Sequence, residues 1–236
     1  MNQDRIWNHF QTQGLELFLQ SVPRLNFLLE QGRRQAHGKR LNVLNIGVGD
    51  GWLELKCGQQ GWNAYALDPS QTALSTLRKS GVKGAAGYVE SIPYIDGFFD
   101  IVFCSELIEH LSSERIERAL SEIQRVLRRS GVLLGTVPFK ENLFAGQVAC
   151  PSCGKVFHRL GHLQSFDLPK LTALFPNSLQ LEKIATTYFA DWSRLNWKGK
   201  LLAVLKKGLL LVGVHGVNEN IYFVARKKGL PEIRHD

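Results

Sequence analysis

The stretch Val43-Leu44-Asn45-Ile46-Gly47-Val48-Gly49-Asp50-Gly51-Trp52-Leu53-Glu54-Leu55 decides how the rest of the chain is read. The apolar run at residues 41–46 predicts a buried parallel strand. The glycines after it allow a tight turn and let a ligand approach bare backbone. The helix expected beyond the turn presents unpaired N–H groups and the positive end of its dipole. This stretch therefore predicts a site for a nucleotide-like cofactor that carries a carboxylate or a phosphate.

The spacing of the glycines indicates which cofactor is expected. A dinucleotide-binding turn, G-x-G-x-x-G, needs a small residue at its last position. That position is occupied here by Trp52, which is too large for close packing of helix on strand. The pattern is instead G-x-G-x-G, and it resembles the first motif of class I S-adenosylmethionine (SAM) dependent methyltransferases. An NAD(P) oxidoreductase is the competing interpretation of the fold, and glycine-rich turns also join ordinary strands and helices.

An acidic residue follows at the distance that a ribose-binding site requires. The second predicted strand, at residues 63–67, ends in Asp68-Pro69-Ser70. Asp68 lies about 20 residues after the glycine turn, where a carboxylate can accept hydrogen bonds from both ribose hydroxyls. The alternative is that Asp68 and Ser70 only cap the helix predicted at residues 71–79.

A second block strengthens the resemblance. A short third strand is predicted at residues 84–88 and a fourth at residues 98–104. Phe99-Asp100 lies at the start of the fourth strand, and the strand is followed by Ser105-Glu106-Leu107-Ile108-Glu109-His110-Leu111. This block looks like the later motifs of the same methyltransferases, and the match is close over residues 40–137. The resemblance implies one α/β domain over residues 1–236. It implies a doubly wound, Rossmann-like sheet of seven strands, mostly parallel with the last strand antiparallel, and helices on both faces.

The resemblance also implies SAM as the cofactor and a set of residues that contact it: Asn45, Gly47, Val48, Gly49, Gly51, Asp68, Pro69, Val89, Glu90 and Cys104. Two positions depart from the family pattern. The family usually has an acidic residue where this chain has Asn45, and an Asp where it has Tyr88. Recognition of the adenine amine is therefore expected from Glu90 or from backbone groups.

The segments outside this block are expected to build the acceptor side. Residues 1–37 read as a helical lid, with a break near Gly14 and a kink near Pro23. Trp7, Phe10 and Gln11 are expected either to line the pocket or simply to pack on the sheet.

The remaining elements complete the predicted sheet. A helix at residues 115–128 is followed by strands at 132–137, 182–189 and 220–225. The Lys- and Leu-rich helix at residues 194–211 is expected to cover the sheet or a substrate pocket, with a membrane-surface helix as the alternative.

The insertion at residues 139–166 carries a possible metal site, Cys150-x2-Cys153-x4-His158-x3-His162. Two thiolates from a Cys-Pro-x-Cys-Gly turn and two histidines four apart could complete a closed, tetrahedral and therefore structural zinc site. The alternatives are unmetallated thiols beside incidental histidines, or a His162 that contacts substrate in a segment resembling the GH-x-x-x-F of many of these enzymes.

Methyl transfer needs correct positioning of donor and acceptor, plus a base where the acceptor is a hydroxyl or a protonated amine. The candidates at the exit of the fourth strand are Glu106, Glu109 and His110, and we assign the catalytic role to His110 with Glu109. The alternatives are a structural role for His110, and His158 or His162 as the base if these histidines bind no zinc. The choice of His110 rests on the ordinary pKa of an imidazole.

Composition sets the remaining expectations. The chain has 236 residues with a net charge of +8, 44% hydrophobic residues and 21% charged residues, as in an ordinary globular domain. No apolar run is long enough to span a bilayer and no leader is visible, so we expect a cytoplasmic protein.

Three classes of function remain open after these observations. The leading class is an O- or N-methyltransferase for a small molecule, a glycan or a natural-product intermediate. The second is an RNA methyltransferase, which the positive charge favours. Against nucleic acid, the fourth strand does not end in an Asn/Asp-Pro-Pro-aromatic motif and no basic–aromatic RNA module is present. The third is a non-catalytic binding module built on a SAM fold or a zinc knuckle.

Overall fold

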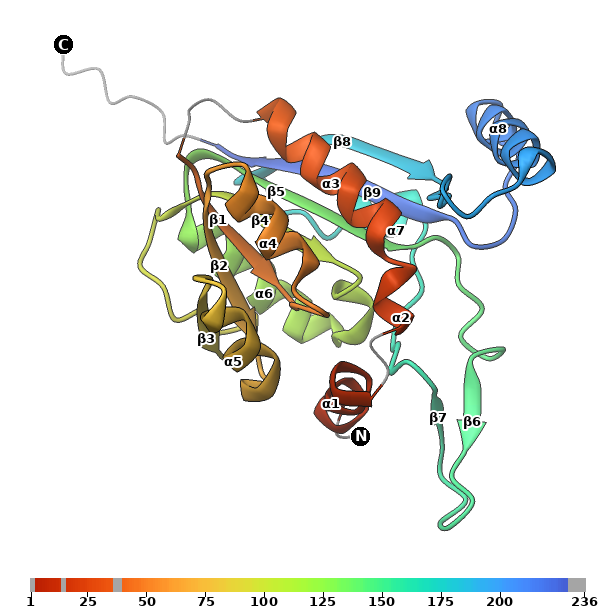
Figure 1. The fold of residues 1–236 in the computed structure, drawn as a ribbon, viewed down its shortest axis with the longest axis horizontal. Helices are drawn as coiled ribbons and strands as arrows, with labels where there is room; N and C mark the ends of the chain where they lie inside the picture. The colour runs from red at the N-terminus through yellow and green to blue at the C-terminus, as the bar shows by residue number, and fades with distance from the viewer. Residues whose placement is uncertain (1–2, 14–15, 36–39, 229–236) are drawn as a thin grey trace.

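The computed structural model describes residues 3–13, 16–35 and 40–228, and these form a sheet covered by helices (Figure 1). The seven strands lie in the order β3-β2-β1-β4-β5-β9-β8. Their bounds are β1 Asn42–Ile46, β2 Asn63–Asp68, β3 Lys83–Ala86, β4 Phe99–Ser105, β5 Leu127–Pro138, β8 Leu179–Thr187 and β9 Asn220–Lys227. The pairs from β3 to β5 are parallel, and β9 runs antiparallel to both β5 and β8. The sheet predicted from the sequence is confirmed.

Helices cover both faces of the sheet because its central strands are apolar on both sides. On one face, α3 (Val22–Gln35) and α4 (Trp52–Gln59) pack on side chains such as Val43 and Phe103. On that face too, Leu74 and Leu77 of α5 (Gln71–Lys79) contact Ala66 of β2.

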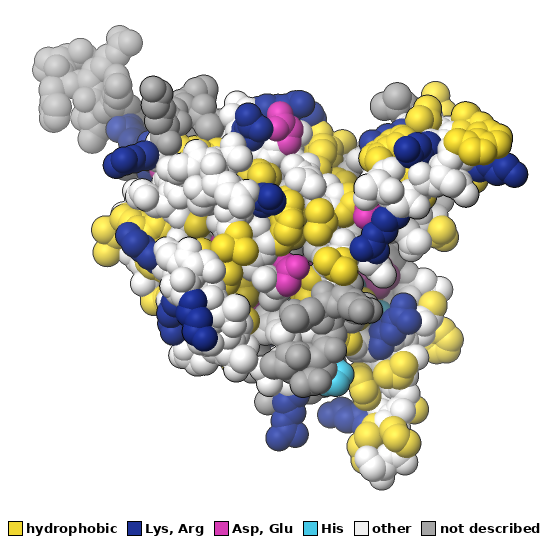
Figure 2. All heavy atoms as spheres, in the orientation of Figure 1, with side chains coloured by type: hydrophobic (Ala, Val, Ile, Leu, Met, Phe, Trp, Pro, Cys, Tyr) yellow, Lys and Arg dark blue, Asp and Glu magenta, His cyan; other side chains and the backbone are white. Residues whose placement is uncertain are grey.

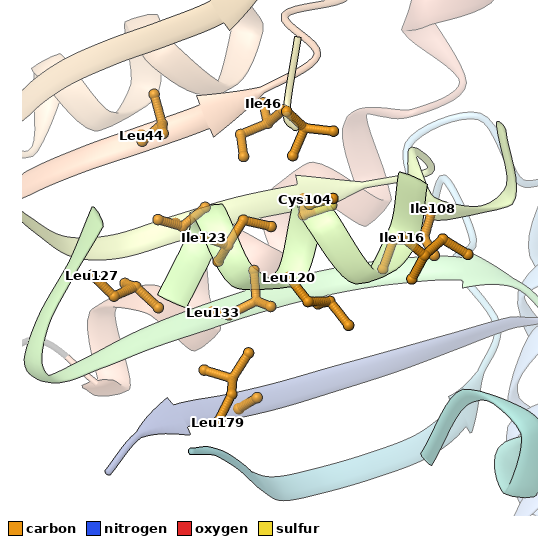
Figure 3. Close-up of a cluster of buried hydrophobic side chains, with 14 of the residues drawn as sticks. Leu44, Ile46, Cys104, Ile108, Ile116, Leu120, Ile123, Leu127, Leu133 and Leu179 are labelled. Carbon is orange, nitrogen blue, oxygen red and sulfur yellow. The ribbon is translucent and has the colours of Figure 1, made fainter. Parts of the chain in front are cut away.

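The other face is covered by α6 (Ser113–Val126). Figure 3 shows Ile116, Leu120 and Ile123 of this helix directed at Leu44 and Leu133 of the sheet. The five-strand core from β1 to β5 is thereby held between two helical layers.

Several element boundaries differ from the sequence prediction for local reasons. Helix α6 ends at Val126 and runs directly into β5, so this strand begins five residues earlier than predicted, at Leu127. Pro23 does not kink a helix; it lies in the first turn of α3, where its missing N–H costs no helical hydrogen bond. The break expected near Gly14 falls outside the described residues.

Two elements stand away from the sheet. A hairpin of β6 (Gln147–Ala149) and β7 (Val156–His158) projects beyond the C-terminal ends of the central strands, and α8 (Trp197–Leu211) projects beyond the C-terminal end of β8 (Figure 1). The expectation that the Lys- and Leu-rich helix covers the sheet or a pocket is wrong. Ala203 is the one buried side chain among those described in α8.

Candidate active site

A cavity of about 1140 Å³ opens at the C-terminal ends of β1, β2 and β4. The strand order reverses between β1 and β4, and ligands of open α/β sheets bind at such a switch point. Small-ligand pockets usually span about 300–1000 Å³. This cavity therefore has room for a nucleoside-sized cofactor together with a second molecule.

The glycine turn forms one wall of the cavity. Gly47 (φ 82°) and Gly49 (φ 56°) adopt backbone conformations that other residues rarely take. A Cβ at Gly49 would lie 3.0 Å from the ring of Phe18, which also lines the cavity. The turn is therefore shaped for close approach of another group to its backbone.

Gly51 has a different role from the one implied by the motif. It does not line the cavity, and a Cβ there would lie 2.3 Å from Cδ2 of Leu77 on α5. The third glycine of the motif allows α4 and α5 to pack together.

Asp68 lies at the end of β2, next to the glycine turn. Its Oδ2 accepts hydrogen bonds from the backbone N–H of Val48 (3.0 Å) and from Nε2 of Gln11 (3.1 Å), and its Oδ1 accepts one from the N–H of Ser70 (2.7 Å). The carboxylate thus lies on the cavity wall, as the sequence predicts for a ribose acceptor, and it also holds helix α1 (Gln3–Gln13) over the site.

Two of the three residues predicted for the N-terminal lid line the cavity, and the third does not. Trp7 and Gln11 line the cavity, whereas Phe10 does not and instead packs edge-on against the Trp7 ring at 5.9 Å. The N-terminal helix is therefore part of the wall, although one of its three predicted residues supports it from behind.

Asn45, which stands where the family usually has an acidic residue, contacts the acidic side chain of Glu54 on α4. The Asn45 amide donates hydrogen bonds to Oε1 of Glu54 (2.9 Å) and to the carbonyl of Gly47 (3.3 Å). Burial raises the pKa of Glu54 to about 8, so this carboxyl is mostly protonated at neutral pH. Glu54 lies within the deciding stretch of sequence, yet nothing in its spacing indicated this contact.

The wall expected to face the adenine contains Tyr88, Val89 and Glu90. Glu90 forms an ion pair with Arg115 of α6, so its carboxylate is held in place. Cys104 was expected here and is not part of the wall. It is completely buried in β4 beside Ile46 and Gly135, and burial raises the pKa of its thiol.

The other end of the cavity holds a group of polar side chains from two distant segments, α3 and the end of β4. Nε of Arg24 donates to Oγ of Ser105 (3.0 Å), and Nη1 of Arg24 lies 3.8 Å from Oε2 of Glu106. Glu106 has a positive φ of 52°, a strained conformation of the kind found at functional sites. Sequence reasoning missed Arg24, because the N-terminal helices were read through their apolar positions.

His110 lines this end of the cavity, with its ring 5.0 Å from that of Trp7 and 4.6 Å from that of His162. Burial, and then the neighbouring His162, lower the pKa of His110 to about 3. The ring is neutral at pH 7 but is a weak proton acceptor. The argument from its ordinary pKa is therefore overturned.

Glu109 is completely buried and does not line the cavity. Burial and the nearby charge of Glu106 raise the pKa of its carboxyl well above the usual value. Glu109 can support His110 and His162, whose nitrogens lie within 4.8 Å of its carboxyl group, but it does not reach a molecule in the cavity.

The four predicted zinc ligands do not assemble. Cys150 and Cys153 lie in the turn at the tip of the β6–β7 hairpin, whereas His158 pairs with Gln147 at its base. In the part of the chain that the structure describes, the groups close enough to share an ion are Glu109/His110/His162 and Glu141/His158/His162, without a cysteine. The strands of the hairpin separate the thiols from the imidazoles, so the predicted four-residue site is wrong.

The histidines of the insertion instead form a buried cluster with a carboxylate. Oε2 of Glu141 is hydrogen-bonded to Nδ1 of His162, and its Oε1 lies 3.6 Å from Nε2 of His158. The His158 and His162 rings stack at 4.7 Å. Since His162 also contacts His110, this cluster supports the cavity wall from behind.

The sheet order, the glycine turn and the acidic residue at the switch point together define the Rossmann-like fold of class I SAM-dependent methyltransferases. Residues 44–135 match the family described as a methyltransferase domain. A SAM-dependent methyltransferase of Thermotoga maritima has a similar structure, with a TM-score of 0.61 and 18% identity over 95% of this chain and all of that one.

Curated relatives match about half of the chain. The ubiquinone biosynthesis O-methyltransferase of Rickettsia bellii is 28% identical over 122 residues, 48% of this chain and 50% of the relative. The malonyl-[acyl-carrier protein] O-methyltransferase of Erwinia pyrifoliae is 31% identical over 109 residues, 45% and 40% respectively. The chain spans about half the length of the curated relatives it matches. Together these findings show a match to a methyltransferase domain over residues 44–135 and the fold of class I SAM-dependent methyltransferases.

Proposed function

We propose that this protein transfers a methyl group from SAM to an oxygen or nitrogen atom of a small molecule, such as a glycan or natural-product intermediate. The observation that supports this most directly is the single cavity shared by two sets of residues. Its cofactor end is formed by the glycine turn and Asp68, and its other end by Arg24, Ser105, Glu106 and His110.

The residues at the first end suit SAM. Asp68 would accept the ribose hydroxyls, in place of the Gln11 amide that it binds in this structure. The backbone of Gly47 and Gly49 would lie against the amino-acid part, and Val89 would pack on the adenine. SAM supplies an electrophilic methyl group attached to a sulfonium.

The residues at the second end suit a polar acceptor. Arg24, Ser105 and Glu106 offer a cation, a hydroxyl and a carboxylate at neighbouring positions, which suits a hydroxylated or charged substrate. We propose that neutral His110 accepts a hydrogen bond from the acceptor and orients it, with Glu109 and His162 holding the ring. A deprotonation by His110 alone would be inefficient, because its pKa is far below neutral pH.

The predicted zinc site has no role in the proposed methyl transfer. The two cysteines offer two thiolates at an exposed turn, and a structural zinc site needs four ligands. Glu141, His158 and His162 lie behind the cavity wall, where His162 contacts His110.

The proposal is tested by calorimetry and by transfer of label. We expect saturable binding of SAM and of its demethylated product, and no binding of NADH. Incubation with methyl-labelled SAM and cell-extract fractions should label the small-molecule or glycan fraction. Label in the RNA fraction would favour the RNA methyltransferase alternative. SAM binding with no label in any fraction would favour a non-catalytic module, and absence of SAM binding would contradict the proposal.

A further inference from the structure

Helix α8 has its apolar side chains on the outside. Six of them are 48–71% exposed, far more than a helix packed on a core would leave to solvent: Trp197, Leu201, Leu202, Val204, Leu205 and Leu209. Exposed hydrophobic residues continue after the helix at Val212, Val214 and Val217. Figure 2 shows hydrophobic side chains gathered with Lys and Arg side chains on the projection that corresponds to α8 in Figure 1.

The side chains that attach α8 to the body lie on its other face. Ala203 is buried, Leu210 is half-buried, and Lys206 lies 3.9 Å above the ring of Tyr188 and donates a hydrogen bond to the carbonyl of Val217. Positions 203, 206 and 210 share one helix face, whereas 197, 201, 205 and 209 follow one another at intervals of four on the opposite face. The apolar face is therefore fixed outward by the way in which the helix is attached.

The charges of this segment have one sign. Residues 192–218 contain five basic side chains, Arg194, Lys198, Lys200, Lys206 and Lys207, and no acidic one. Lys198, Lys200 and Lys207 are exposed. By helical position, Lys200 and Lys207 lie along one edge of the apolar face, and Lys198 lies on that face in the first turn of the helix. An apolar face with lysines on it and along its edge, together with an exposed Trp, is the pattern of helices that lie in the interface of an anionic bilayer.

We propose that α8 docks this protein on anionic membrane surfaces, with its outward face buried among the lipid headgroups and its flanking lysines on the lipid phosphates. No helix among the described residues is long and apolar enough to cross a membrane, so the contact is a surface one. A second copy of the chain does not match the charge of this face. In a twofold contact the same lysines would oppose each other, and like charges repel.

Vesicle co-sedimentation of the full chain tests the proposal. Vesicles of phosphatidylcholine with phosphatidylglycerol should bind the protein at least about tenfold better than phosphatidylcholine alone, since each lysine near an anionic surface contributes about fivefold. The double variant Leu201→Glu/Leu205→Glu should lose binding to both. Its matched control is Ile95→Glu, which places a carboxylate at another exposed apolar position, 72% exposed.

The charge is tested separately. Lys198→Gln/Lys200→Gln should weaken binding to anionic vesicles by roughly 25-fold. Arg33→Gln/Arg34→Gln, which removes two exposed charges from α3, should leave it unchanged. Equal unfolding temperatures of the variants and the parent show that the fold is retained.

Three results would overturn the proposal. The first is no sedimentation of the parent with either vesicle, and the second is equal sedimentation of Leu201→Glu/Leu205→Glu. The third is a parent that is dimeric by light scattering, with vesicles leaving it in solution and the double variant becoming monomeric. In that case the face binds a second copy. SAM binding is unaffected by any of these outcomes, so the proposed methyl transfer is judged independently.

Discussion

Asp68 is the residue on which cofactor binding is expected to depend most. Replacing it by Ala removes an acceptor that is charged and only 4% exposed. We expect Asp68→Ala to weaken SAM binding by about 1–3 kcal/mol, the scale of charge-assisted hydrogen bonds. Calorimetry of Asp68→Ala and of the isosteric Asp68→Asn measures this, with Glu117→Ala, an exposed acidic residue of α6, as the control. Unchanged affinity in both Asp68 variants would remove this residue from the site.

Glu54 should make stability depend on pH. Its pKa is about 8 in the folded protein and near 4.5 in an exposed carboxyl, so between these values the native state holds one proton more than the unfolded chain. The contribution of Glu54 to stability is then fully present below about pH 4.5 and falls as the pH rises to about 8, by roughly 1.4 kcal/mol per pH unit. Glu54→Gln should flatten this part of the profile, as measured by urea unfolding from pH 5 to 8.5. A variant with the parent's slope would contradict the assignment.

His110 is expected to act by orientation and not by taking a proton at neutral pH. Once an acceptor is identified, His110→Ala should lower kcat, while a pH–rate profile of the parent should show no inflection between pH 6 and 7 from this residue, because its pKa is about 3. An inflection in that range that disappears in His110→Ala would restore the role of a general base.

At the scale of elements, we expect opposite effects on stability from replacing two glycines of α4, Gly51 at its N-cap and Gly58 within the helix. Gly51 has a φ of 82° and faces Leu77, whereas a Cβ at Gly58 within α4 meets nothing within 4 Å. Gly51→Ala should destabilise the fold by about 1–3 kcal/mol through strain and overpacking. Gly58→Ala should be neutral or stabilising by up to about 1 kcal/mol. Chemical unfolding of both variants checks this, and equal effects would contradict it.

The sequence predicted the cofactor end of the site much better than the acceptor end. Gly47, Gly49 and Asp68 lie directly after strands, where parallel topology brings them together without further information. Arg24 reaches the acceptor end, and Glu141 reaches His162 behind it, from segments whose positions depend on tertiary packing. The zinc prediction failed because the ligand spacing assumed a compact knuckle, whereas the chain forms a two-stranded hairpin that separates the thiols from the imidazoles.

At the scale of the whole molecule, the fold was predictable because its motifs are local and occur in order. The position of helix α8 was not predicted correctly, because its apolar content suggested burial. Only its attachment through Ala203 and Lys206 shows which of its faces is outward. Periodicity alone does not reveal whether an apolar helix face meets a core or a partner.

Cofactor binding should stabilise the whole domain, since the cavity joins the sheet to the N-terminal helices. At a ligand concentration of about 100 times Kd, the gain is about 2.7 kcal/mol, or roughly 5–10 °C in unfolding temperature for a chain of this size. Thermal unfolding with the demethylated cofactor should show this shift, and NADH should not produce it. Equal shifts with both ligands would indicate a site without the expected selectivity.

The position of β9 between β5 and β8 has a consequence for how the protein is made. During translation β5 and β8 are synthesised before residues 220–227. Their backbone edges therefore stay unpaired until β9 inserts between them. The nascent domain cannot close its sheet until residues 220–227 have been synthesised, and this interval is when it most needs a chaperone.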